Sequence, residues 1–177
     1  FTLPNSLTSI GTYAFDGCSS LTTMVVPNTI TNLEEGTFSY CTGLTSISLP
    51  NSLLSIGRFA LDSCSSLPAI DIPNSVTTIG YGSFYGCTSL TTLVVPNSVT
   101  TIGDYAFEAC SGVTSFTLPN TISAIGIGVF DGCSSLTSIE IPTTVTTIGN
   151  IAFRNCSSLT TINIPISVTT IGTSVFQ

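Results

Sequence analysis

The feature that most constrains this chain is a 23-residue period that runs through all of it. Seven cysteines and eight prolines recur at this interval, namely Cys18, Cys41, Cys64, Cys87, Cys110, Cys133 and Cys156, and Pro4, Pro27, Pro50, Pro73, Pro96, Pro119, Pro142 and Pro165. A fixed period of this size is typical of solenoids, in which each repeat forms one coil of a stack. We therefore interpret residues 1–177 as a single solenoid domain of about seven and two-thirds coils, and as an excerpt of a longer array.

Composition excludes several classes of partner. Arg58 and Arg154 are the only basic residues, and the formal net charge is -7. Such a chain repels a phosphate backbone or an anionic membrane surface, so we expect no nucleic-acid partner. No apolar run approaches the roughly 18 to 20 residues of a membrane span, so we expect no direct insertion into a membrane.

Each coil begins with a short, half-buried strand. In 90–95 the pattern alternates, with Leu93 and Val95 facing inward and Thr92 and Val94 facing outward. Equivalent strands one coil apart must pair in parallel, which predicts a sheet of about eight strands centred near residues 2, 25, 48, 71, 94, 117, 140 and 163. Phe1 and Leu3 are the inward pair of the first strand.

The rest of the coil returns to the start of the next strand. Proline ends each strand, and the β-branched run after it predicts a second, shorter strand near 99–102. Gly103 permits a sharp bend or a positive φ. Residues 105–110 then suit one or two helical turns on the other side of the coil. These turns bury a spine formed by Phe15, Phe38, Leu61, Phe84, Phe107, Phe130, Phe153 and Phe176.

The cysteines are expected to be reduced and buried. Side chains in equivalent slots stack in parallel and do not point at one another, so they lack disulfide geometry. They act instead as small apolar groups with a weak S–H donor. The sequence has no histidine, and no carboxylates cluster around the thiols, which argues against a zinc site.

Residues 136–156 follow the pattern Leu-x-x-Ile-x-Ile-Pro-x-x-Val-x-x-Ile-Gly-x-x-Ala-Phe-x-x-Cys, and variants of it cover the whole chain. This repeat resembles the BspA-like class of leucine-rich repeat. The resemblance implies an α/β fold, a right-handed leucine-rich repeat horseshoe. It also implies display at the cell surface or outside the cell, and adhesion to host or matrix proteins. It implies no catalytic residues and no cofactor.

The residues themselves also argue against an enzyme. Nucleophilic catalysis needs a base beside a Ser or Cys, and the chain has no histidine. Four carboxylates share the slot two residues before the cysteine: Asp16, Asp62, Glu108 and Asp131. We expect them to solubilise the helical side, with weak Ca²⁺ binding near Glu108 and Asp131 as an alternative. Arg154, in the next coil, is expected to form an exposed ion pair with Asp131.

The outer face of the sheet is the predicted partner-binding surface. Its middle position varies from coil to coil while the buried positions beside it do not, and small hydroxyl residues surround it. We call these residues the sheet-face column: Val25, Ser48, Asp71, Val94, Thr117, Glu140 and Asn163. Solenoids use such extended faces for recognition, so Asp71, Val94, Thr117 and Glu140 are expected near the centre of a contact.

Two functional hypotheses remain. The first is a binding or adhesion module that holds a protein or glycan of a host, a matrix or a neighbouring cell. The second is a structural repeat protein that self-associates into a surface filament or coat. Variety in the sheet-face column favours the first, and the low content of charged residues favours the second. An ice-binding surface is a distant third, because no regular Thr-x-Thr column occurs.

Overall fold

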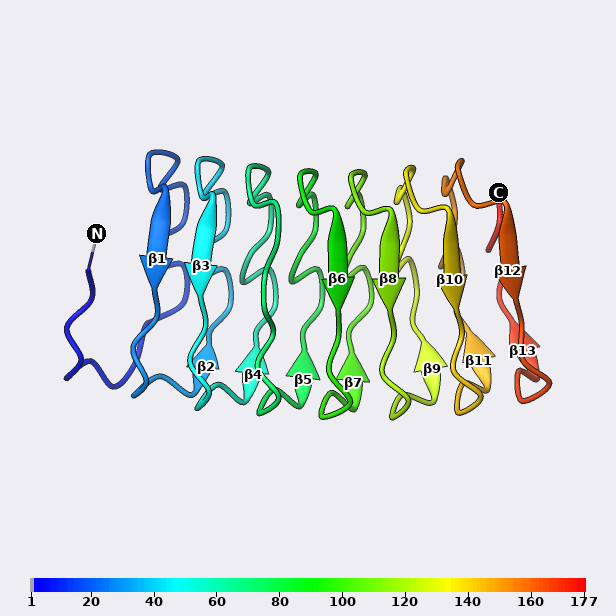
Figure 1. The fold of residues 1–177 in the computed structure, drawn as a ribbon, viewed down its shortest axis with the longest axis horizontal. Helices are drawn as coiled ribbons and strands as arrows, with labels where there is room; N and C mark the ends of the chain where they lie inside the picture. Colours follow the sequence, from blue (N-terminus) through cyan, green and yellow to red (C-terminus); the bar gives the residue numbers. More distant parts are fainter. Residues whose placement is uncertain (1) are drawn as a thin grey trace.

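The chain forms a parallel β-solenoid whose coils line up in one row along the long axis (Figure 1). The computed structural model describes residues 2–177; Phe1, predicted to face the core, lies outside this range. The coils form two rows of strands that run in opposite directions along the coil (Figure 1). We call the row of three-residue strands the first sheet and the row of two-residue strands the second sheet.

The first sheet follows the predicted register. Its strands pair in parallel with partners 23 residues apart, for example Leu93 with Phe116 and Phe116 with Ile139. The strands are β1 (Thr23–Val25), β3 (Ser46–Ser48), β6 (Thr92–Val94), β8 (Ser115–Thr117), β10 (Ser138–Glu140) and β12 (Thr161–Asn163). They form a two-stranded sheet, β1-β3, and a four-stranded sheet, β12-β10-β8-β6.

The strand predicted near residue 71 is therefore missing, which corrects the expectation of one continuous sheet. Pro68 occupies the slot whose backbone N–H bonds to the preceding coil elsewhere, as Thr45 N–H does to Thr22 O at 2.8 Å and Thr114 N–H to Thr91 O at 2.9 Å. Proline has no N–H, so this bond cannot form just before residues 69–71. The strand predicted near residue 2 is also absent, because residues 2–4 lie apart from β1 and do not pair with it (Figure 1).

The predicted second strand recurs from the second coil onward. The two-residue strands are β2 (Asn32–Leu33), β4 (Ser55–Ile56), β5 (Thr78–Ile79), β7 (Thr101–Ile102), β9 (Ala124–Ile125), β11 (Thr147–Ile148) and β13 (Thr170–Ile171). They pair in parallel as β2-β4-β5-β7 and β13-β11-β9, with an interruption between β7 and β9. Their apolar residues face the same interior as those of the first sheet, since Leu33, Ile56 and Ile79 are almost completely buried.

The predicted helical turns are wrong: residues 2–177 form no helix, and hence none that could span a membrane. We call residues 104–109 and their equivalents the turn segments. Tyr105 and Ala109 both have φ of 58°, far from helical values, and the same two positions are left-handed in the other coils. Alternate N–H groups bond within the coil and to the next one: Glu108 N–H donates to Tyr105 O at 3.1 Å, but Phe107 N–H donates to Val129 O at 3.0 Å. The neighbouring coil thus takes donors that a helix would need.

In most coils the glycine before the turn segment allows the close approach of the preceding coil's backbone and does not serve a positive φ. Gly103 does not have a positive φ, but a Cβ there would lie 2.5 Å from Tyr81 N and 2.7 Å from Gly80 C in the preceding coil. Gly11 occupies the equivalent position in the first coil, but a Cβ added there would have no atom within 4 Å. Glu34 fills this slot in the second coil. Residues 9–10 of the first coil form no strand, so the first coil does not pair with β2.

The core is one apolar column that runs through the stack. Phe38, Phe84, Phe107, Phe130 and Phe153 are almost completely buried, and neighbouring rings of the spine stack with centroids 5.3 to 5.9 Å apart. Leu61 fills the third slot of the spine without exposure. Offset stacking of this kind adds to the area buried, so each coil depends on both neighbours.

The cysteines form a second buried ladder beside the phenylalanines. All seven are free, and all except Cys18 are buried; Cys18, in the first coil, is exposed, contrary to expectation. Each buried thiol points at a main-chain carbonyl of the preceding coil, as Cys110 Sγ does at Phe84 O, 3.1 Å away, and Cys133 Sγ at Phe107 O, 3.3 Å away. Burial raises the pKa of Cys41 to about 11 and that of Cys87 to about 12, so these thiols stay protonated.

Candidate binding surface

The sheet-face column is exposed along its whole length. Strands β1, β3, β6, β8 and β10 each show an exposed, buried, exposed pattern, so their central residues enter the core and their flanks face solvent. Asp71 is exposed too, although its segment is not a strand. Two members are apolar: 60% of Val25 and 64% of Val94 is exposed. The side chains of the sheet-face column thus do not pack in the core, as the alternation predicts.

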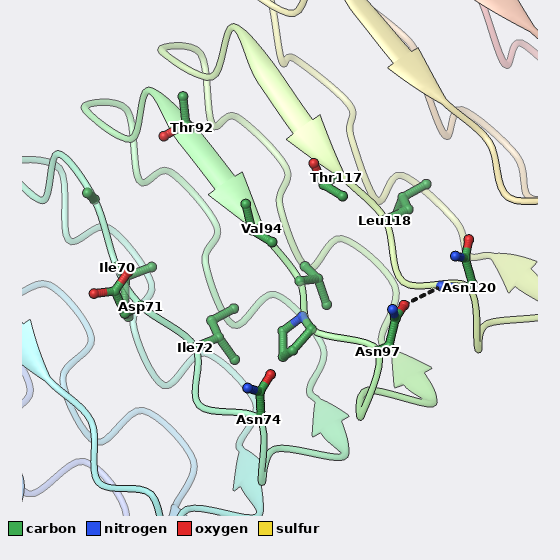
Figure 2. A pocket seen from close by; sticks show the side chains of 13 residues that line it. Ile70, Asp71, Ile72, Asn74, Thr92, Val94, Asn97, Thr117, Leu118 and Asn120 are labelled. Carbon is green, nitrogen blue, oxygen red and sulfur yellow. Dashed lines mark hydrogen bonds between the residues drawn. The ribbon is translucent and has the colours of Figure 1, made fainter.

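A hollow of about 500 Å³ brings three members of this column together. Asp71, Val94 and Thr117 line it from three consecutive coils, and it spans the interruption of the first sheet (Figure 2). We call it the sheet-face hollow. Asp71 is its one charged lining residue, and both arginines of the chain lie elsewhere, in turn segments.

Asparagine side chains form the rim of the sheet-face hollow. Asn74, Asn97 and Asn120 each follow the proline that ends a strand segment (Figure 2). The Asn120 N–H donates to Asn97 Oδ1 at 2.8 Å, which ties neighbouring coils together at the rim. Amide groups both donate and accept hydrogen bonds, so the rim can pair with peptide groups or with sugar hydroxyls.

The other predicted site residues lie outside the sheet-face hollow. Glu140 lines a smaller hollow of about 270 Å³ that shares Thr117 with the first. Asn163 lies further along the face, in a depression with Glu140. Val25 and Ser48 lie on β1 and β3, on the other side of the interruption at Asp71. The structure therefore brings Asp71, Val94 and Thr117 together in one hollow, with further hollows along the same face at Glu140 and Asn163.

The carboxylates of the turn segments do not all behave as surface groups. Asp131 is 2% exposed, so its ion pair with Arg154 is not the exposed bridge that the sequence suggests. Arg154 donates from Nε at 3.0 Å and from Nη2 to Asp131 Oδ2, while Asn155 Nδ2 donates to Oδ1 at 3.1 Å. The hydrogen bond to Asp131 raises the pKa of Arg154.

These contacts disfavour the Ca²⁺ alternative. Both oxygens of Asp131 are engaged, and burial, followed by the charge of Asp131, raises the pKa of Glu108. No group of three or more His, Cys, Asp or Glu side chains within residues 2–177 is placed to hold a metal ion. Asp62 is also buried, at 7% exposure, so neither it nor Asp131 serves mainly to solubilise its face.

A second unusual surface, which the repeat pattern does not predict, lies on the turn segments. All five tyrosines, Tyr13, Tyr40, Tyr81, Tyr85 and Tyr105, lie in these segments, as do both arginines and six of the nine carboxylates. None of the tyrosines occupies the buried spine slot. Aromatic residues outside the core slots were the signal that could have revealed this surface, since the repeat pattern does not require them.

Comparisons with known proteins agree with the architecture. The chain matches the family model for the BspA type leucine rich repeat region in six copies, over residues 1–113 and 55–177. No relative is found among curated proteins.

Three solved structures illustrate the likeness. A leucine-rich repeat protein from Bacteroides ovatus is 31% identical with a TM-score of 0.92; the match covers 97% of this chain and 47% of that protein, so the chain spans about half its length. The leucine-rich repeat protein of T. pallidum is 32% identical with a TM-score of 0.82, covering 89% and 76%. A leucine rich cell surface protein from Faecalibacterium prausnitzii is 27% identical with a TM-score of 0.58, covering 92% and 62%.

Proposed function

The chain belongs to the BspA-type leucine-rich repeat family, and from this membership we propose that it is a non-catalytic module that holds a protein or a glycan on the exposed face of its first sheet. The comparisons indicate no enzyme family. The proposed setting is the cell surface or the extracellular space, in line with the description of the similar Faecalibacterium protein as a cell surface protein.

The sheet-face hollow is the observation that carries the proposal. An exposed valine between an aspartate and a threonine offers apolar area for a partner to bury, with polar groups on both sides to fix its orientation. The buried core beneath it provides a rigid platform, so a partner would lose little binding energy to ordering this surface. Because the lining residues differ between coils, the sheet-face hollow offers a combination of side chains that the other hollows of this face do not repeat.

The test replaces Val94 and Thr117 together with Arg. Both side chains point into solvent, so the double variant should melt at the temperature of the wild type and keep its association state. Adhesion to cells or matrix should fall at least about tenfold, because two long charged side chains fill the hollow. The matched control is Val25→Arg, an equally exposed valine of the same column outside the hollow.

Two outcomes would contradict the proposal. If the double variant adheres like the wild type, the partner does not use this face. If adhesion is intact but self-association fails, the structural role in a filament or coat should replace the binding role.

A further inference from the structure

The turn segments present aromatic side chains that folding does not require. Tyr13 is 49% exposed and Tyr40 is 54% exposed. The slot of Tyr40 holds Gly, Ser, Ala or Asn in the other described coils, so packing does not call for an aromatic ring. Tyr40 also has φ of 54°, a conformation that favours glycine over bulky residues. A large ring kept at a strained, exposed position suggests a role in binding.

Four aromatic rings and two carboxylates meet in a hollow of about 440 Å³ on this surface. The rings belong to Tyr13, Tyr40, Phe59 and Tyr85, and the carboxylates are those of Asp16 and Asp62. We call this the tyrosine hollow. Its volume suits the end of one long side chain.

The tyrosine hollow is rich in negative potential and poor in free donors. Among residues 2–177 the ion pairs are Arg58 with Glu35 and Arg154 with Asp131, so no basic side chain neutralises Asp16 or Asp62. Ser39 Oγ already donates to Asp16, and Tyr13 Oη already donates to Glu35 at 3.1 Å. The hydroxyls of Tyr40 and Tyr85 are the remaining side-chain donors of the lining. A sugar needs donors as well as acceptors, whereas a cation needs acceptors and aromatic faces.

The same surface already holds one guanidinium group in this way. The Arg58 guanidinium carbon lies 5.0 Å from the centroid of Tyr81 and 5.8 Å from that of Phe59, while Arg58 Nε lies 3.9 Å from Glu35 Oε1. Phe59 also lines the tyrosine hollow. Phe59 thus links the tyrosine hollow to a place on the same surface where aromatic rings and a carboxylate already receive a guanidinium group.

We propose that the tyrosine hollow binds the guanidinium end of an arginine side chain presented by a protein partner. The ring faces of Tyr13, Tyr40, Phe59 and Tyr85 receive the planar cation, and Asp16 and Asp62 accept its N–H groups. This site lies on the turn segments, whereas the surface proposed for adhesion lies on the first sheet, so the two can be tested separately.

The test titrates the ¹⁵N-labelled chain with N-acetyl-arginine amide and records backbone amide shifts by NMR. We expect saturable shifts confined to the amides around Asp16, Tyr40 and Asp62, with a Kd on the order of 1–10 mM, because the site is open to water. The neutral isostere N-acetyl-citrulline amide should shift these amides at least about tenfold less at equal concentration. Sodium chloride should weaken the arginine shifts.

Two variants locate the interaction. Tyr40→Asn places in this slot the residue found at Asn155, and Asp62→Asn removes the buried charge; each should weaken binding at least about tenfold. Tyr105→Gly is the matched control, because Tyr105 lies outside the hollow and its slot holds glycine in Gly36, Gly82 and Gly128. Three results would overturn the proposal. The first is equal amide shifts with the citrulline and arginine compounds. The second is unchanged arginine binding in both Tyr40→Asn and Asp62→Asn when their spectra show an intact fold, and the third is tighter binding of a neutral sugar.

Discussion

Replacing Gly103 with Ala should separate two coils, whereas the same change at Gly11 should not. The added Cβ at Gly103 would lie 2.5 Å from Tyr81 N and 2.7 Å from Gly80 C. Ordinary contacts of this kind begin near 3.4 Å, so one backbone must retreat by about an ångström. Both obstructing atoms belong to the main chain and cannot rotate away.

The magnitude follows from what the retreat disturbs. The Gly103 N–H bonds to Ile79 O at 2.8 Å, and β5 pairs with β7 immediately before it. Overpacking costs about 1–3 kcal/mol, and weakening one backbone bond adds about 1 kcal/mol. We therefore expect Gly103→Ala to lower the free energy of unfolding by about 2–4 kcal/mol. At Gly11 no atom lies within 4 Å, and Gly11→Ala should change it by less than about 1 kcal/mol, in the stabilising direction.

Urea unfolding followed by far-UV circular dichroism measures both variants against the wild type. Hydrogen exchange at Thr101 and Ile102 should also accelerate in Gly103→Ala, because these residues lie beside the displaced contact. If the two variants differ in unfolding free energy by less than about 0.5 kcal/mol, the close approach is not what selects glycine here.

Three further predictions follow from single positions. In the native protein, Cys18 should react quickly with a thiol reagent at neutral pH. The six buried cysteines should react slowly, because burial keeps the reagent out and raises the pKa values of these thiols. All seven should react after denaturation, and seven fast thiols in the native protein would refute this prediction. Burial raises the pKa of Asp62, so the native state holds this proton more tightly than the unfolded state does. In urea titrations, the stability of the wild type relative to Asp62→Asn should therefore fall as the pH rises from about 3.5 to 7. A rise in this relative stability would contradict the effect of burial. Ile151 has a left-handed φ of 53°, and the equivalent slot in the preceding coil holds Gly128. Ile151→Gly should therefore raise the free energy of unfolding by about 1 kcal/mol. A decrease of that size would show that the packing of Ile151 outweighs its backbone strain.

Most of the fold could be predicted because the 23-residue period allows equivalent strands one kind of neighbour. The period sets the parallel register of Leu93 beside Phe116, and alternation sets the exposure of Val94 and Thr117. The helical turns could not be predicted in this way. Six residues with a buried Phe are compatible with a helix, and only the competition of the next coil for backbone N–H groups decides against it.

The features that the repeat pattern does not predict arise at residues that depart from it. Pro68 removes one backbone donor and interrupts the first sheet beside Asp71, where the sheet-face hollow lies. The five tyrosines create a second surface that the core slots do not require. Asp131 is buried and forms an ion pair with Arg154, one coil later. The column of acidic residues predicts this pair, but the burial of Asp131 depends on side-chain packing that the sequence does not show.

The central claim, that the first sheet holds the partner, can be tested most directly by photo-crosslinking from position 94. Benzoylphenylalanine would replace Val94 in one protein and, on a turn segment, Ile127 in another, since both native residues are exposed. On cells or matrix to which the wild type adheres, the position-94 protein should form a covalent adduct with a surface protein or glycan, and the Arg variant of Thr117 should suppress that adduct. Adducts that join position 94 only to a second copy of this chain, or that form only from position 127, would contradict the claim.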